Sequence, residues 1–296
     1  MNAGREAQHR LGSSGSVNCG VAILLYALTA VLYAGLAFHF WRTRWLKPGV
    51  AGMASWERVG ILVVCALHAW LLYDALFLTD ELRFGFALAL SAMLWLTVVI
   101  YWVESLVLNL EGLQALVLGV TALCVGLPAL FPGLVAPPAA RSPEFRMHTV
   151  LAVLAYGLFT MAALHALLMT LVERRLHGQP RPGSLSGPIG ALPPLLSMEK
   201  LLFRLIAVGF LLLTLTLATG VLYSETLFGQ AMKFNHKTFF ATASWIIFAA
   251  LLAGRYWYGW RGRLALRWTL AGFLSLLLAY VGSRFVLEVL LHRPAA

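Results

Sequence analysis

The sequence predicts an all-α, polytopic membrane protein with about eight transmembrane helices and both termini on the outer side of the membrane. Hydrophobic residues make up 60% of the chain and charged residues only 11%, whereas a soluble domain carries about 25% charged residues. The apolar residues gather in stretches of about 20, the length that crosses a bilayer as a helix. No alternating pattern typical of a membrane β-barrel is present, so helices are the spanning elements.

Eight stretches satisfy the length and hydrophobicity of a spanning helix. In order they are residues 21–41, 59–79, 84–103, 114–134, 148–172, 202–223, 237–254 and 268–288. The fourth is the least regular, because it contains Pro128 and Pro132, which cannot donate helical hydrogen bonds. The boundary between the second and third stretches is the least sharply marked.

Composition divides the chain into four parts. Residues 1–20 form a polar tail. We expect its first 17 residues to be disordered or to result from an early start codon. The first apolar run is long enough to span the membrane, so we expect no cleaved signal peptide to end in this tail. Residues 177–200 are rich in Gly, Pro and Ser and predict a flexible linker on the inner face. It separates a five-helix membrane segment, residues 21–176, from a three-helix segment, residues 201–290. No internal repeat is visible.

Basic residues set the predicted orientation, since Lys and Arg concentrate in the loops on the inner face of a membrane. Thirteen of the 22 lie around the first, fifth and seventh loops, and the other side with both tails holds nine. This places both termini outside. In a membrane protein the net charge of +10 fits loops that meet anionic lipid better than it fits nucleic acid binding.

Several functional classes lack their sequence signatures. Cys19, Cys65 and Cys124 form no CxxC pair, which argues against thiol redox chemistry, an iron–sulfur cluster or structural zinc. No nucleophile–base pair, phosphate-binding loop or zinc-ligand spacing is visible, so we do not expect an enzyme in the ordinary sense. An ion or small-molecule carrier is disfavoured because few polar residues interrupt the apolar runs and no repeated pair of broken helices occurs.

Two histidines are the main candidates for a functional site. His148 opens the fifth stretch and His236 opens the seventh, so both are expected at the outer face and at similar depth. Imidazole is a common ligand of metals and of heme iron, and two imidazoles on two helices could hold an iron between them. The alternative is that each is an interfacial histidine that meets water.

The other histidines are weaker candidates. His68 lies inside the second stretch, where an ionisable residue is a functional candidate, although a histidine bonded to a neighbouring helix explains it equally well. His165 and His39 lie toward the inner ends of their helices, about 25 Å from the outer pair in the case of His165, and could at most belong to a second, inner site. The remaining three, in the tails and the linker, are expected to be solvated: His9, His177 and His292.

Several segments in the second half resemble the cytochrome c assembly family of heme-handling membrane proteins, which includes the CcsA and CcmC types and the shorter HemX-like proteins. The resemblance covers residues 145–290 most strongly and is closest to the short inner-membrane branch, the YpjD-like proteins. The matching segments are HTVLAVLAY (148–156), PPLLSMEK (193–200), LTLATG (215–220), HKTFFATASW (236–245), GWRGR (259–263) and AYVGS (279–283).

The resemblance implies a multi-pass protein of the bacterial inner membrane that binds b-type heme non-covalently. His148 and His236 match the two outer heme-ligand positions of the family, and His68 is a looser match to a transmembrane histidine. The lipid bilayer and other cytochrome assembly or tetrapyrrole-related proteins are the implied partners. One departure is clear: the tryptophan-rich WGxxWxWD outer loop of heme-delivering members is missing, and residues 224–236 read SETLFGQAMKFNH.

Two alternative functions therefore remain. One is a heme-binding protein of cytochrome c assembly, in which two histidines ligate the iron and an apolar wall excludes water. The other is a non-catalytic regulator or scaffold of the HemX type, which would act on a partner protein through its Arg-rich inner loops. A visible absorption spectrum separates the two.

Overall fold

The computed structural model describes residues 3–46, 52–78, 83–108, 112–135, 142–178, 195–228 and 236–291. The regular structure in this part of the chain is helical, and one isolated β-bridge pairs Arg83 with Val135. The helices are α1 (Ala3–Phe40), α2 (Ser55–Tyr73), α3 (Phe86–Ser105), α4 (Leu113–Cys124), α5 (Leu127–Leu130), α6 (Pro143–Gly178), α7 (Leu195–Phe228), α8 (His236–Tyr258), α9 (Gly262–Leu277) and α10 (Ser283–Phe285). π-Helical turns extend four of them: η1 (Trp41–Leu46), η2 (Asp74–Leu78), η4 (Leu278–Gly282) and η5 (Val286–Leu290).

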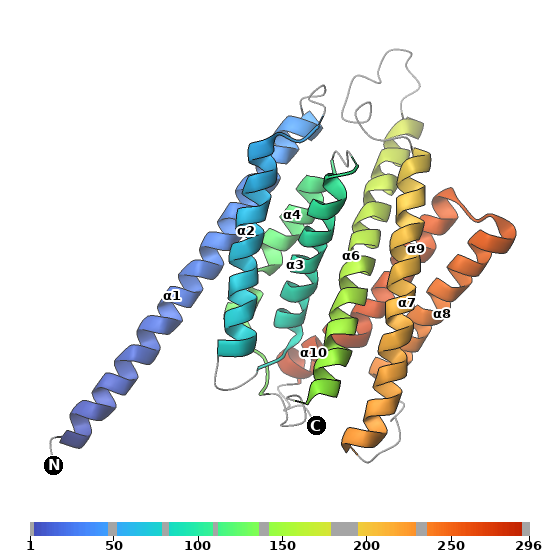
Figure 1. Ribbon diagram of the computed structural model, residues 1–296. Coiled ribbons are helices and arrows are strands. Elements are labelled where there is room, and N and C mark those ends of the chain that lie inside the picture. Colours follow the sequence, from blue (N-terminus) through green and yellow to red (C-terminus); the bar gives the residue numbers. More distant parts are fainter. Residues whose placement is uncertain are drawn as a thin grey trace.

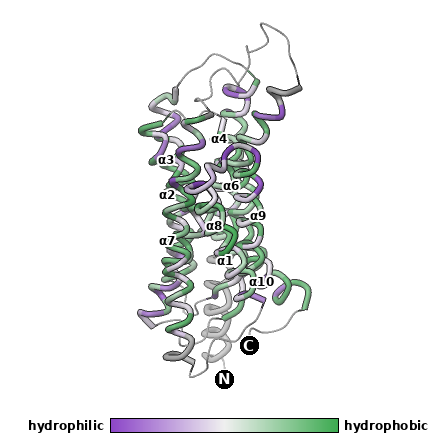
Figure 2. Tube along the Cα trace, turned by 90° about the vertical axis from the view of Figure 1, so that its right-hand side faces the viewer, coloured by the Kyte–Doolittle hydropathy of each residue, from purple (hydrophilic) through white to green (hydrophobic). Residues whose placement is uncertain are grey.

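Eight helical spans in the described residues are long and apolar enough to cross a membrane. They are Gly20–Leu46, Ser55–Leu78, Phe86–Ser105, Leu113–Leu130, Pro143–Arg174, Leu196–Tyr223, His236–Tyr258 and Gly262–Leu290. Each overlaps one of the eight stretches read from the sequence, so the prediction of an all-α, eight-helix membrane protein is confirmed. Figure 2 shows hydrophobic residues predominating along the helices.

The fourth span is broken, as its prolines suggest. α4 ends at Cys124, and the short α5 begins at Leu127 with Pro128 in its first turn. Proline is tolerated there because the first N–H groups of a helix have no intrahelical acceptor. α5 ends at Leu130, two residues before Pro132.

The helices pack as two groups that share one core (Figure 1). α1, α2, α3 and α4 pack on one another, and α6, α7, α8 and α9 form a second group in which neighbours in sequence are neighbours in space. The rings of Phe159 on α6 and Phe248 on α8 stack at the centre of the second group, with centroids 4.0 Å apart. α3 packs against α6 and joins the two groups.

α3, α6 and α8 begin at one end of the bundle, and the free ends of α1 and of the α10 region lie at this same end (Figure 1). We call it the histidine end, because His148 and His236 lie there. The side of the membrane that this end faces stays a prediction. The flexible linker falls mostly on residues 179–194, which lie outside the described residues. The two segments that it separates pack together, α6 against both α7 and α9.

Candidate functional site

His148 lies in the second turn of α6 and leans against α7. Its Nδ1 atom is 3.0 Å from the hydroxyl oxygen of Thr219, and the imidazole also interacts with the backbone of Thr216. The side chain is half-buried. The contact joins the HTVLAVLAY and LTLATG segments, which are 71 residues apart in the chain, so two of the segments that carried the family resemblance meet at this histidine.

The hydrogen bonds of Thr219 favour one tautomer of this histidine. A threonine hydroxyl has one hydrogen to donate, and the Thr219 hydroxyl lies 2.9 Å from the carbonyl of Leu215 and 3.1 Å from that of Thr216. With its hydrogen on a backbone carbonyl, the hydroxyl oxygen accepts the Nδ1–H of His148. The lone pair of the imidazole is then on Nε2. This is the neutral form that ligates a metal, held by a hydrogen bond to the other nitrogen as metal-bound histidines generally are.

Gly220 gives the imidazole its room on α7. A Cβ atom at this position would lie 3.3 Å from Cε1 of His148, tighter than an ordinary van der Waals contact. The final two residues of the LTLATG segment therefore act together: Thr219 accepts a hydrogen bond from the ring and Gly220 lets it approach the helix.

His236 is the first residue of α8, and its side chain is exposed. His148 precedes Phe159 by 11 residues, and His236 precedes Phe248 by 12; the helical rise converts these separations to about 16 and 18 Å. Because Phe159 and Phe248 stack on each other, the two histidines lie at nearly equal heights above this pair. No contact joins the two imidazoles themselves in the described structure.

His68 is fully buried between α1 and α3. Its Nε2 is 2.8 Å from the hydroxyl of Ser91, and its Nδ1 is 3.4 Å from the hydroxyl of Tyr33. Both ring nitrogens thus have protein partners. Ligation of an iron by His68 would require it to release one of them.

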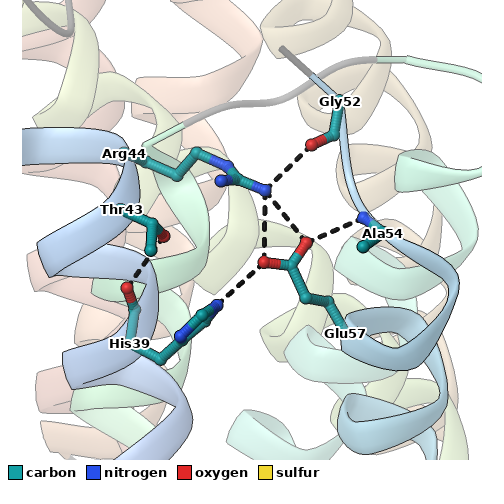
Figure 3. A network of polar contacts seen from close by, with 6 residues as sticks. All are labelled: His39, Thr43, Arg44, Gly52, Ala54 and Glu57. Carbon is teal, nitrogen blue, oxygen red and sulfur yellow. Dashed lines mark hydrogen bonds and ion pairs between the residues drawn. The ribbon is translucent and has the colours of Figure 1, made fainter. Parts of the chain in front are cut away.

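His39 belongs to a polar network (Figure 3) near the end of α1, which lies opposite to the starts of α6 and α8 (Figure 1). Its Nε2 is 2.8 Å from Glu57, whose carboxylate also pairs with Arg44 at 2.9 Å and accepts the N–H of Ala54 at 2.8 Å. The Arg44 guanidinium donates to the carbonyl of Gly52. Arg44 and Glu57 are buried. The network ties the end of α1 to the start of α2.

His165 lies inside α6, fully buried, and neither ring nitrogen has a hydrogen-bond partner of good geometry. The backbone of Met198 on α7 lies near it. Among the described residues, no contact joins His165 to His39. Among the described residues, no group of three His, Cys, Asp or Glu side chains is placed to hold a metal ion. The side chains of His9, His177 and His292 lie outside the described residues.

Other family-like segments hold the helices together. Tyr156, eight residues after His148, donates to the carbonyl of Leu276 on α9 at 2.9 Å. Trp245 of the HKTFFATASW segment donates to the hydroxyl of Thr214 on α7 at 2.9 Å. Glu199 of PPLLSMEK pairs with Arg255 at the end of α8. These residues fix the positions of α7, α8 and α9 relative to α6.

Sequence reasoning missed three features. The roles of Thr219 and Gly220 depend on α6 packing on α7, which no local pattern reveals. The buried Arg44–Glu57 pair was not predicted, because the basic residues around the first loop were used only for the orientation. Arg284 and Glu288 lie within the last apolar stretch and were not singled out. An ionisable residue inside a spanning segment is a functional candidate by default, so that rule could have found the last two.

Comparison with known proteins identifies a family. A family model described as Cytochrome C assembly protein matches residues 53–291. The chain is 34% identical over 149 residues to the protein named Inner membrane protein YpjD of Escherichia coli strain K12, a match covering 50% of this chain and 54% of that protein. It is 39% identical over 147 residues to an uncharacterized 28.8 kDa protein of Azospirillum brasilense, covering 49% and 52%.

A protein named Cytochrome c biogenesis protein CcsA, from Prochlorococcus marinus strain AS9601, is 29% identical over 164 residues, covering 50% of this chain and 53% of that protein. The chain thus spans about half the length of the curated relatives that it matches. The family model covers most of the eight spans and the contacts of His148. This chain therefore belongs to the cytochrome c assembly protein family.

Proposed function

We propose that this protein is a multi-pass protein of the bacterial inner membrane that binds b-type heme non-covalently, for cytochrome biogenesis or heme handling, and that it is not an enzyme. His148 and His236 would hold the iron from two sides. The names of the relatives support the membrane and the process: one is named as an inner membrane protein and others as cytochrome c biogenesis proteins.

The observation that carries the proposal is the hydrogen bond between His148 and Thr219. It leaves the Nε2 lone pair of His148 available, and a second helix begins at similar height with an exposed histidine, His236. Iron bound to two neutral imidazoles is the chemistry that this donor pair would support. The surrounding apolar helix surfaces would exclude water from the macrocycle.

A visible absorption spectrum of the purified, full-length protein in detergent tests the proposal. We expect a Soret band after expression with added heme precursor, and a low-spin spectrum typical of two imidazole ligands. His148→Ala and His236→Ala each remove one ligand, so each should weaken or abolish that spectrum. Exogenous imidazole should restore part of it by occupying the vacated ligand position.

His177→Ala is the matched control, because this histidine is expected to be solvated, and it should leave the spectrum unchanged. If both single variants kept the wild-type spectrum, His148 and His236 would not be the ligands, and His68 with His39 or His165 would be the next set to test. A colourless wild type that copurifies with a soluble enzyme would instead favour the regulatory function.

A further inference from the structure

His165 is a polar side chain in the interior of the bundle that the described helices leave unsatisfied. It lies in α6 and is fully buried, and neither ring nitrogen has a hydrogen-bond partner of good geometry among the described residues. The backbone of Met198 on α7 lies near the ring, and a single backbone group can engage only one of the two nitrogens. The other nitrogen is left without a partner. Buried polar groups of this kind are rare, and a bound ion is one explanation for them.

Two buried methionines accompany this imidazole. Met169 follows His165 by four residues on α6, so the two side chains share one face of the helix. A long side chain on a helix leans toward the N-terminus of that helix, which for Met169 is the direction of His165. Met198 is the residue of α7 whose backbone lies near the ring. Both methionines are almost completely buried.

The register of α6 against α7 brings the two methionines together. Phe159 lies beside Gly209 on α7, and eleven residues earlier on α6 His148 lies beside Gly220. Eleven residues along one helix thus correspond to eleven residues along the other, in the opposite direction. Met198 precedes Gly209 by eleven residues, about three helical turns, so it lies on the face of α7 that packs on α6. It therefore faces the turn of α6 that carries the other methionine.

These three side chains form a donor set for a soft, monovalent cation. Thioether sulfur and imidazole nitrogen are ligands that suit Cu(I), whereas Mg²⁺ and Ca²⁺ prefer oxygen ligands. All three groups are neutral, so a monovalent ion brings a single charge into the dry interior, where each further charge costs free energy. Ala162 and Ala166, which flank His165 on α6, are also fully buried. Such packing admits an ion more readily than a macrocycle.

We propose that His165, Met169 and Met198 bind Cu(I). One ring nitrogen of His165 would be held by the backbone of Met198, and the lone pair of the other would face the metal. Histidines that ligate metals generally have their second nitrogen engaged in this way. Seventeen residues of α6, about 25 Å, separate His165 from His148. The copper site is therefore separate from the candidate heme site and does not depend on heme.

The test is a competition for Cu(I) between the detergent-purified, full-length protein and the chelator bathocuproine disulfonate, under anaerobic and reducing conditions. His165→Leu, Met169→Leu and Met198→Leu each remove one ligand and keep an apolar side chain of similar size. Loss of a group that only orients a metal ligand costs about 10- to 100-fold in affinity, so each variant should lose at least about tenfold. Copper K-edge absorption of the wild type should show both sulfur and nitrogen neighbours.

Met93→Leu is the matched control, because Met93 is a buried methionine on α3. Four residues after it, Thr97 donates to the carbonyl of Gly157 on α6, at 3.3 Å. Since α3 and α6 run in the same direction (Figure 1), Met93 lies about 18 Å from His165 along the bundle. This variant should bind Cu(I) as the wild type does.

Thermal unfolding without metal separates the loss of a ligand from the loss of the fold. His165→Leu removes buried polar atoms that lack a partner, so it should unfold at the same temperature as the wild type or a higher one. The two methionine variants conserve side-chain volume, which cores tolerate well, and they test the site even if His165→Leu folds poorly.

A wild type that takes up no Cu(I), or variants that bind it as tightly as the wild type, would overturn the proposal. Copper neighbours consisting of nitrogen and oxygen alone would do the same, because the thioethers would then not be ligands. Loss of a Soret band in His165→Leu would assign this histidine to heme and equally remove the copper site. Failure of the protein to bind heme, with Cu(I) bound as described, would overturn only the proposed function.

Discussion

At the scale of single residues, two polar contacts organise opposite ends of the bundle. Thr219 accepts a hydrogen bond from His148 at the histidine end, and Glu57 joins Arg44 and His39 at the other. Both contacts link helices that are separate in the sequence. The first orients the imidazole of a candidate ligand, and the second compensates charges that would otherwise be buried alone.

Thr219→Val removes the acceptor for the Nδ1–H of His148 and keeps the shape of the side chain. The imidazole can then rotate or change tautomer, so we expect heme affinity to fall about ten- to a hundredfold, as for other groups that orient metal ligands. Thr219→Ser keeps the hydroxyl and should retain most of the affinity. Soret titration measures both. Thr170→Val is the control, because the Thr170 hydroxyl donates only to its own helix; an equal loss there would contradict the orienting role.

Arg44→Met leaves Glu57 buried with the weaker partner His39. Removing one member of a buried ion pair costs about 3–5 kcal/mol, so the thermal unfolding temperature in detergent should fall clearly. Adding Glu57→Leu to Arg44→Met removes the buried carboxylate that has lost its partner, and should restore much of the lost unfolding temperature. Arg42→Met, at an exposed neighbouring position, should change little. Similar unfolding temperatures for Arg44→Met and Arg42→Met would contradict the stabilising role of the network.

At the scale of helices, the second group depends on the aromatic pair at its centre. Phe159 and Phe248 are fully buried, and glycines on the two flanking helices make room for them: Gly209 on α7 faces Phe159, and Gly272 on α9 faces Phe248. The pair fixes the relative height of α6 and α8, and thereby the relative height of His148 and His236.

Phe248→Ala should open a cavity between α6 and α8 and destabilise the protein by about 3–5 kcal/mol. Since the two helices then lose their shared contact, we also expect a broader and weaker heme spectrum. Thermal unfolding and the Soret band measure the two effects on the same sample. Phe239→Ala, which removes an exposed ring near the start of α8, is the control. An unaltered unfolding temperature in Phe248→Ala would contradict the importance of the stacked pair.

At the scale of the whole molecule, the helix ends that carry most of the basic residues lie at the end opposite to the histidines: the ends of α1, α6 and α8 and the starts of α2, α7 and α9 (Figure 1). Acidic residues partly neutralise them: Glu57 pairs with Arg44, Glu199 with Arg255, and Glu173 lies 3.4 Å from Arg263. Even so, Lys and Arg remain in excess at these helix ends, which supports the prediction that this end of the bundle faces the cytoplasm.

Reporter fusions test this orientation. Alkaline phosphatase folds only outside the cytoplasm, so a fusion after residue 296 should be active and a cytoplasmic reporter at the same place inactive. A fusion within residues 179–194 should give the opposite pattern. The reverse result would place His148 and His236 at the cytoplasmic face and remove the argument that heme is bound on the outer side.

The amino-acid sequence by itself determined the fold class, the eight spans and the position of His148 and His236 at helix starts, because apolar length and helix-end residues are local properties. The equal heights of the two histidines also followed approximately from these starts. The tertiary structure alone decided what the side chains touch. The contact of Thr219 with His148 joins two helices across 71 residues of sequence, and the pairing of Glu57 with Arg44 joins the end of α1 to the start of α2. Hydropathy carries no information about which side chains of two helices face each other.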